Sequence, residues 1–371
     1  MMIRTYFSTI LTAILLITGL AGGCEQPTEP PEPEEPYFKP GQYGGDPLED
    51  TEHLYNLQLS PDGSKIALIR SRTPGGVFEP RDQLWIVNAD GTEPELIGYN
   101  IGTVDWSIDG KKMAVTYIPG APYTYSFTIS LDSMKATQWT GSEDMFLSKR
   151  SASNPRWFND NQRLLISVWA KAYKQPYERG VYIINTNDQA IEGPLVEIAA
   201  GAFLGNNEKY FISNKYTTQD NPLSGNYIRY DFLSNKFDWI TNTSSDSLNR
   251  WVKQPRPNPK GAELVYTRHT KNAWQLFMMD EKGTNEEQLT ELGGSEVSWS
   301  KDGRQVYFNR DTHKAPGARY IPHYYELATG NIAPIWPNLP DSVPEFPALD
   351  TQNPIDFRGI VQDSAATSNT N

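Results

Sequence analysis

Six stretches of the sequence share one pattern, and this repeat constrains the fold more than any other feature of the chain. The clearest copies are "LQLSPDGSKIALIRSR" from residue 57, "VDWSIDGKKMAVTYIP" from 104 and "VSWSKDGRQVYFNRDT" from 297. Each contains an alternating strand, a turn with Asp-Gly and a second apolar strand, which is typical of a β-hairpin. Weaker copies begin at residues 155, 201 and 255. The turn residues lie 42 to 54 residues apart and are Gly63, Gly110, Asn161, Asn207, Gly261 and Gly303.

A second series of hairpins runs in step with the first. Its copies include "QLWIVNADG" from residue 83 and "GVYIINTND" from 180, and each ends in another polar turn. One unit therefore contains four strands, two tight turns and one longer connection. Four strands at a period of about 40 to 50 residues are typical of a propeller blade. The sequence thus predicts an all-β fold, a six-bladed β-propeller with four antiparallel strands per blade, over residues 46–340.

The motif Ser60-Pro61-Asp62-Gly63 and its copies resemble the repeat of the TolB-like, WD40-like (PD40) propellers. The resemblance covers roughly residues 52–338 and implies the fold. TolB also carries an amino-terminal α/β domain that has no counterpart here, so the resemblance does not imply the partners of TolB. The dipeptidyl-peptidase family places a hydrolase domain after such a propeller, but this sequence has no Gly-x-Ser-x-Gly motif. We therefore expect no catalytic residues of that kind.

The amino terminus carries an apolar run, residues 10–20, followed by small residues and by Cys24, the only cysteine of the chain. This pattern predicts a signal peptide over residues 1–23. The stretch from Leu20 to Cys24 resembles the lipobox of bacterial lipoproteins, although Ala21 stands where that family usually has Leu. The resemblance implies lipidation of Cys24. The alternative is an ordinary signal peptide with an incidental cysteine.

Residues 24–45 are rich in Pro and Glu and predict an extended tether between the lipid and the propeller. The formal charge of −12 argues against nucleic acid and against electrostatic binding to anionic lipid. We therefore expect membrane association through the lipid anchor only, at the bacterial cell envelope and most simply its outer membrane, with the periplasmic or surface-facing side left open. Residues 341–371 form a carboxy-terminal tail in which 355–363 is a candidate ring-closing strand, in competition with 36–45.

Propeller topology predicts where function lies. The connections from the second to the third strand of each blade all emerge on one face, and they are long in five of six blades, as in "RTPGGVFEPRD" and "AKAYKQPYERG". This long-loop face is the predicted binding face, because function gathers in irregular loops on a rigid scaffold. Three arginines occupy one equivalent place, seven residues after the turn residue: Arg70, Arg268 and Arg310. The other binding candidates of this face are Tyr117, Tyr123, Tyr125, Tyr173, Tyr177, Tyr216, Arg319 and Tyr320.

Clustered arginines favour an anionic or carboxylate-bearing ligand. The alternative is that each arginine pairs with a nearby Asp or Glu and only ties blades together. His269 and His313 follow the second strands of two neighbouring blades and resemble half of the metal site of uronate-cleaving propeller lyases, but no third histidine accompanies them. We therefore expect no metal and no other cofactor.

Other conspicuous residues have structural explanations. Asp62, Asp109 and Asp302 are expected to bond their own turns. Packing between blades is expected to bury most of a set of tryptophans in the repeats: Trp85, Trp106, Trp157, Trp239, Trp274 and Trp299.

Two functional hypotheses follow from the sequence. The first is a lipid-anchored, non-catalytic envelope propeller that binds a protein or peptide partner through the long-loop face. The second is the binding or lyase-type cleavage of an anionic, uronate-like oligosaccharide in the central funnel.

Overall fold

The protein is described by a computed structural model that defines residues 51–73, 82–120, 123–140, 151–169, 179–197, 199–215, 226–241, 252–270, 274–291, 293–311, 320–347 and 352–360. The chain divides into two units, Met1–Pro36 and Tyr37–Asn371, and all the described residues belong to the second. No helix among them is long and apolar enough to cross a membrane.

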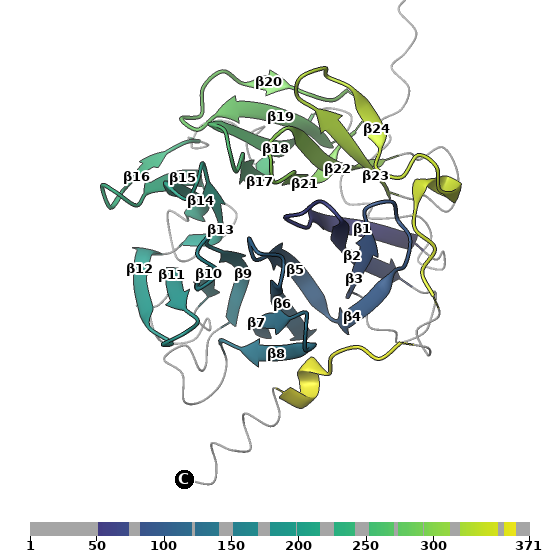
Figure 1. Ribbon diagram of the computed structural model, residues 1–371. Coiled ribbons are helices and arrows are strands. Elements are labelled where there is room, and N and C mark those ends of the chain that lie inside the picture. The colour runs from purple at the N-terminus through teal and green to yellow at the C-terminus, as the bar shows by residue number, and fades with distance from the viewer. Residues whose placement is uncertain are drawn as a thin grey trace, which may run out of the picture. The chain divides into compact units, whose positions relative to one another are not determined.

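The strands follow one another around a central axis in groups of four, each group forming one antiparallel blade (Figure 1). Blade 1 comprises β1 (Thr51–Leu59), β2 (Lys65–Thr73), β3 (Asp82–Asn88) and β4 (Glu95–Tyr99). Blade 2 comprises β5 (Ile101–Trp106), β6 (Lys112–Gly120), β7 (Tyr123–Ser130) and β8 (Lys135–Gln138). Blade 3 comprises β9 (Ser151–Trp157), β10 (Arg163–Trp169), β11 (Gly180–Asn185) and β12 (Ile191–Glu197). Blade 4 comprises β13 (Ala199–Gly205), β14 (Tyr210–Lys215), β15 (Asn226–Asp231) and β16 (Lys236–Trp239). Blade 5 comprises β17 (Val252–Pro257), β18 (Glu263–His269), β19 (Trp274–Asp280) and β20 (Glu287–Gln288). Blade 6 comprises β21 (Ser295–Trp299), β22 (Gln305–Asp311), β23 (Tyr320–Glu326) and β24 (Ile332–Pro334). The predicted fold class is confirmed.

The tight turn between the first two strands of blade 1 is built by side chains that bond to the main chain. Ser60 Oγ donates to Asp62 Oδ1 at 2.6 Å and accepts the N–H of Lys65 at 2.9 Å. Asp62 Oδ1 also accepts the N–H of Ser64 at 3.0 Å. Gly63 takes a φ of 75°, a left-handed conformation that glycine adopts without steric cost. The hydrogen bonds from Ser60 and Ser64 lower the pKa of Asp62 to about 2.

The same bonding recurs in the turns of blades 2 and 6, where Asp109 and Asp302 take the place of Asp62. The structural role expected for these aspartates is therefore confirmed. A positive φ is found at five of the six turn residues: Gly63, Gly110, Asn161, Asn207 and Gly303. Gly261 is the exception. Its turn is held by Asn258 Oδ1, which accepts the N–H of Lys260 at 2.9 Å and that of Gly261 at 3.0 Å.

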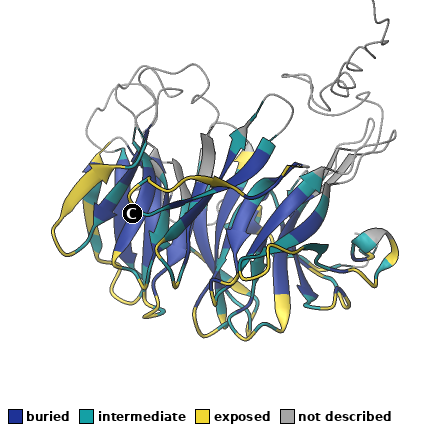
Figure 2. Cartoon of the chain, turned by 90° about the horizontal axis from the view of Figure 1, so that it is seen from above, coloured by how far each residue is buried: buried dark blue, intermediate teal, exposed yellow. Residues whose placement is uncertain are grey.

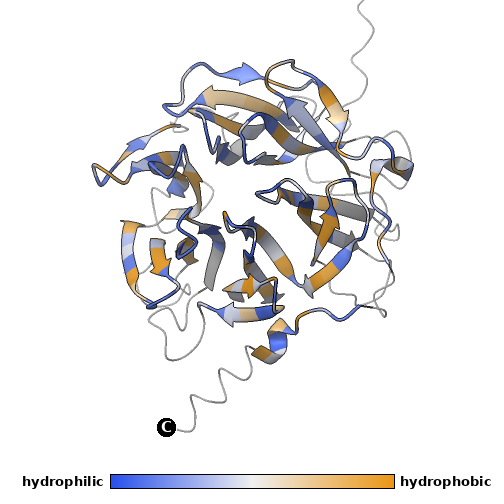
Figure 3. Cartoon of the chain, viewed as in Figure 1, coloured by the Kyte–Doolittle hydropathy of each residue, from blue (hydrophilic) through white to orange (hydrophobic). Residues whose placement is uncertain are grey.

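Hydrophobic clusters fill the interfaces between blades, because apolar side chains of one sheet pack against the next sheet. Many residues of the strands are accordingly hydrophobic (orange in Figure 3). Between blades 1 and 2, Ile69 and Leu84 share a cluster with Val115 and Phe127, and all four have an exposed fraction of 0%. Buried residues consequently form the middle of the disc, while the turns below are exposed (Figure 2).

The other face of blade 1 is covered by the chain that follows the last blade. Trp336 packs there beside Trp85 and donates its Nε1–H to Ala89 O at 3.1 Å. The ring of Phe346 meets Trp85 edge-on at 5.0 Å between centroids. A 3-10 helix, Pro340–Ser342, lies between these two contacts in the sequence. The carboxy-terminal segment therefore supplies a hydrophobic layer for blade 1.

The first and last blades also meet at the axis. Ser298 Oγ in blade 6 donates to Leu57 O in blade 1 at 2.5 Å, and one parallel pair, His53 with Tyr320, joins β1 to β23. The candidate strand at 355–363 contributes one isolated parallel bridge, between Ile355 and Gly98 of β4. Residues 357–360 then form a helical turn, and residues 361–363 and 36–45 lie outside the described part of the chain.

Four of the tryptophans expected in the core have small exposed fractions: Trp85 0%, Trp106 3%, Trp157 6% and Trp299 8%. Trp239 differs from the expectation. It lies on β16, the outermost strand of blade 4, where it is 46% exposed and contacts only the half-exposed Phe237 among the aromatic rings described. An outermost strand has no further blade to pack against, which explains the difference.

Candidate binding site at the centre of the propeller

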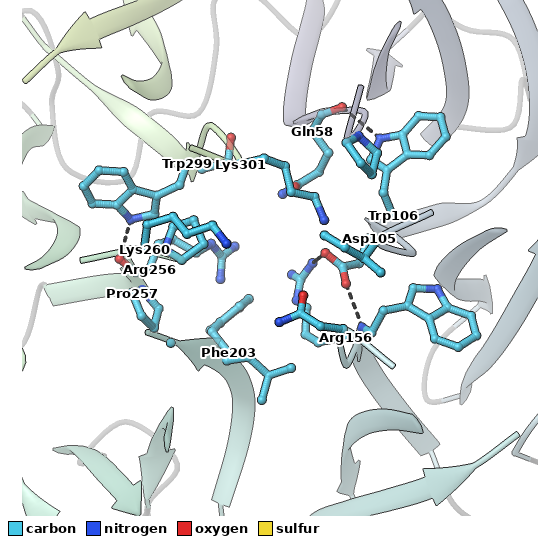
Figure 4. A pocket seen from close by; sticks show the side chains of 18 of the residues that line it. Gln58, Asp105, Trp106, Arg156, Phe203, Arg256, Pro257, Lys260, Trp299 and Lys301 are labelled. Atoms are coloured by element: carbon cyan, nitrogen blue, oxygen red, sulfur yellow. Dashed lines mark hydrogen bonds and ion pairs between the residues drawn. The ribbon is translucent and has the colours of Figure 1, made fainter. Parts of the chain in front are cut away.

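The innermost strands of the six blades surround a central cavity of about 420 Å³ (Figure 4). Its wall is formed by the last residues of these strands and by the tight turns that follow them, so the cavity opens on the tight-turn face of the disc. Two or three residues from the end of each innermost strand line it. We call the first of them in each strand the channel ring: Gln58, Asp105, Arg156, Phe203, Arg256 and Ser298.

Every innermost strand shifts its pairing register, and in five of them the shift ends at the channel-ring residue itself. Such bulges bend a strand and redirect the side chain that follows. Four residues with positive φ stand two positions before a channel-ring residue and mark these bulges: Asn56, Asn154, Gly201 and Glu296. The bulges therefore help to orient the side chains that form the cavity wall.

Arg156 connects blade 3 to blade 2 and is only 5% exposed. Its Nη1 donates to Val104 O at 3.0 Å and lies 3.6 Å from Asp105 Oδ1. The other carboxylate oxygen, Asp105 Oδ2, accepts the N–H of Trp157 at 2.7 Å. Burial lowers the pKa of Arg156, and the charge of Asp105 opposes this shift. Within the described structure, Nε and Nη2 of Arg156 are buried without a hydrogen-bond partner.

Arg256 makes the corresponding connection from blade 5 to blade 6. Its Nε donates to Val297 O at 3.1 Å, while its own carbonyl oxygen accepts Nε1–H of Trp299 at 2.7 Å. The guanidinium carbon lies 3.6 Å from the ring centroid of Phe203, and that of Arg156 lies 4.6 Å from the same centroid. Burial and the like charge of Arg156 lower the pKa of Arg256. Nη1 of Arg256 is also buried without a partner among the described residues.

The cavity contains further charges of both signs. Lys260 and Lys301 come from the turns of blades 5 and 6, and burial lowers the pKa of Lys301. The three carboxylates in the wall, those of Asp105, Glu208 and Asp302, each accept a hydrogen bond from a neighbouring main-chain or hydroxyl group. Each acidic group thus has at least one donor, and Lys260, Lys301 and Arg256 point toward the central space (Figure 4).

The three arginines predicted from the repeat lie on second strands, near the ends that point away from the tight-turn face. Arg70 stacks on Phe346, with 4.5 Å from its guanidinium carbon to the ring centroid. Arg268 forms an ion pair at 2.7 Å with Glu286 of its own blade, so it pairs with a carboxylate as the alternative expected, but this pair does not join two blades. Arg310 is half-buried on β22. None of the three lines the described cavity. A binding role for them stays a prediction.

The predicted tyrosines are placed differently from one another. Tyr117 is 3% exposed and stacks on Phe357 at 5.4 Å and on the half-buried Tyr125 at 6.4 Å, so it belongs to the core between blades 1 and 2. Tyr123 and Tyr320 lie on described strands, but their side chains are outside the described part of the structure. The remaining candidates of the long-loop face lie wholly outside it: Tyr173, Tyr177, Tyr216 and Arg319.

Of the predicted histidine pair, His313 and the side chain of His269 lie outside the described residues. Among the residues that the structure does describe, no group of three or more His, Cys, Asp or Glu side chains is arranged to hold a metal ion.

The sequence analysis missed the channel ring, although the repeat contains a signal for it. Five of the six channel-ring residues stand five positions before the turn residue of their blade. At this position the residue is Gln, Asp, Arg or Ser in these five blades, whereas the next residue is Trp in blades 2, 3 and 6; in blade 4 Phe203 stands four positions before Asn207. Arg156 and Arg256 were therefore identifiable as equivalent residues, but not as residues that contact one phenyl ring.

The fold and the cavity together define a six-bladed propeller of four-stranded blades with a cationic centre. No protein-family model matches the chain, and no curated protein matches its sequence significantly. Among solved structures, TolB from Acinetobacter baumannii is similar, with 14% identity over 76% of this chain and 62% of that one and a TM-score of 0.51. This chain thus corresponds to less than two thirds of that TolB.

The tricorn protease is similar to a comparable degree, with 15% identity and a TM-score of 0.54. The match covers 80% of this chain but only 27% of the protease. At such identities the likeness concerns the fold, and it agrees with the resemblance to TolB-like propellers that the repeat predicts.

Proposed function

We propose that this protein is a lipid-anchored, non-catalytic propeller of the bacterial cell envelope that binds a peptide segment of a protein partner at the mouth of its central cavity. The observation that carries the proposal is the cavity of about 420 Å³, a size within the usual range for ligand sites. The long-loop face was the binding face expected from the sequence, and most residues of its loops lie outside the described part of the chain. The tight-turn face is the surface whose described geometry supports binding.

The lining favours a peptide over a sugar. An oligosaccharide is usually held by the open faces of aromatic rings, but Trp106 and Trp299 have buried rings whose N–H groups are bonded to the main chain of a neighbouring blade. The phenyl ring of Phe203 is contacted by two guanidinium groups. The rest of the wall mixes aliphatic residues and prolines with cations, which suits side chains and polar groups of an extended peptide.

An anionic oligosaccharide remains the second candidate, because the guanidinium groups of Arg156 and Arg256 would also accept the carboxylate of a uronate. The two candidates differ in the ligand that the purified protein selects. We would therefore screen the full chain against a peptide display library and, in parallel, against oligogalacturonates.

A substitution at the cavity mouth makes the screen specific for this site. Ile108 lines the cavity and is 36% exposed, whereas Leu233 is 95% exposed on blade 4 and does not line it. We expect selected peptides to bind Leu233→Arg as they bind the unaltered protein and to lose binding to Ile108→Arg. Peptides that bind both variants equally, or oligogalacturonates that bind in place of peptides, would refute the proposal.

The lipid anchor is tested separately in bacteria that express the full chain. If Cys24 carries the lipid, Cys24→Ser should move the protein from the membrane fraction to the soluble fraction, because the substitution removes the acceptor thiol. Retention of Cys24→Ser in the membrane fraction would contradict the lipid anchor.

A further inference from the structure

We propose that Arg156 and Arg256 form a clamp for a carboxylate at the centre of the propeller, supplied by an Asp or Glu side chain of the bound peptide or by its carboxy terminus. The inference rests on the proposed peptide-binding function and names the group that the centre of the site holds.

The two arginines are prepared for such a ligand by their positions in the fold. Each comes from the end of an innermost strand, and each is fixed by one hydrogen bond to a carbonyl oxygen of a neighbouring blade, Val104 O for Arg156 and Val297 O for Arg256. Both guanidinium groups contact Phe203. The side chains are therefore held in place before a ligand arrives, which reduces the conformational entropy lost on binding.

The remaining N–H groups have no described partner. Nε and Nη2 of Arg156 and Nη1 of Arg256 are buried and unpaired among the described residues. A buried donor without an acceptor is costly, and a charged donor more so. A carboxylate has two oxygens that accept several hydrogen bonds in the plane of a guanidinium group, so it is the group best suited to these donors.

The charges of the channel ring fit an anion. Asp105 lies beside Arg156 at 3.6 Å and compensates its charge. Arg256 forms no ion pair with any described residue. One carboxylate would therefore neutralise the ring. Lys301, also at the mouth, would attract the same ligand.

Three short peptides with blocked amino termini test the clamp: Ac-Gly-Glu-Gly-NH₂ carries a side-chain carboxylate, Ac-Gly-Gly-Gly-OH a terminal carboxylate, and Ac-Gly-Gln-Gly-NH₂ neither. Their binding to the full chain is measured by calorimetry at low ionic strength. We expect at least one carboxylate peptide to bind about tenfold or more tightly than the neutral one, since a charge-assisted hydrogen bond contributes about this much. The better of the two identifies the source of the carboxylate.

Variants then assign the effect to the arginines. Arg256→Gln should reduce the preference for the carboxylate peptide about tenfold or more. Asp105→Asn should tighten binding of that peptide, because it removes the competing charge and keeps an acceptor for the N–H of Trp157. Arg304→Gln serves as the control, because it removes the same charge from a side chain that is 84% exposed and does not line the cavity.

The outcomes separate this inference from the proposed function. If the three peptides bind equally, or if Arg256→Gln and Arg304→Gln behave alike, the carboxylate clamp is wrong while binding at the mouth stands. If no peptide binds and the display library selects none, both proposals are wrong. Weaker binding in Asp105→Asn would also refute the clamp, and this variant does so without removing an arginine.

Discussion

The contact between the carboxy-terminal segment and blades 1 and 2 gives a quantitative prediction for Phe357→Ala. Phe357 is 2% exposed. Its ring lies 5.4 Å from that of Tyr117 and 5.1 Å from that of Phe127. It also covers Gly98 so closely that a Cβ there would lie 2.4 Å from Phe357 Cε2. Removing a buried phenyl ring costs about 3–5 kcal/mol in a protein core. We expect the lower end, about 3 kcal/mol, because the short terminal segment can detach without opening the blades.

The assay is urea unfolding of the full chain, followed by tryptophan fluorescence. The matched control is Phe237→Ala, which removes the same ring from the outer strand of blade 4, where it is 39% exposed. The control should cost less than about 1 kcal/mol, since this ring lies on an outermost strand and already contacts water in part, so its removal leaves no closed cavity. A loss in Phe357→Ala no larger than that in Phe237→Ala would show that the terminal segment does not stabilise the propeller.

Two further predictions concern the tight turns. Gly63→Ala should cost about 1 kcal/mol of unfolding free energy, because Gly63 has a φ of 75° but open space around its Cα. Gly303→Ala should cost clearly more in the same unfolding assay, because a Cβ there would also meet Asn258 Oδ1 at 2.1 Å. Equal losses in the two variants would contradict this reasoning. The pKa of Asp62 is about 2, below its usual value of 3.8. The stability that its carboxylate contributes is therefore fully present above pH 3.8 and is lost as the pH falls toward 2. Asp62→Asn should therefore be less stable than the unaltered protein at pH 7 and lose less stability between pH 4 and pH 2, and parallel pH profiles would be the contrary result.

The blade count and the turn chemistry were predictable because they depend on neighbouring residues. A hairpin is formed by residues a few positions apart, so "SPDG" and its copies specify both the turn and the register of the strands beside it. The exception at Gly261 has a local cause as well. This turn is held by hydrogen bonds to the side chain of Asn258 and not by a glycine with positive φ. Such an exchange of one turn-stabilising interaction for another is difficult to recognise in a sequence.

The candidate site was less predictable, because attention to long loops favoured one face of the disc and the described cavity lies on the other. Tyr117 illustrates the difficulty. Its place near the end of β6 suggested a loop contact, yet Phe357 of the carboxy-terminal segment, 240 positions later in the chain, packs on its ring. A contact between residues so distant in the chain leaves no pattern in the sequence around either of them.

The repeating unit, its strands and its turns could therefore be predicted from the order of residues, since they follow from hydrogen bonds and apolar alternation within a few tens of residues. Which side chains meet at the axis depends instead on how the blades are assembled. Arg156, Phe203 and Arg256 come from three different blades, and both arginines contact Phe203 because closing the ring brings the ends of three innermost strands together around one cavity. That convergence is a property of the closed ring of blades and not of any single repeat.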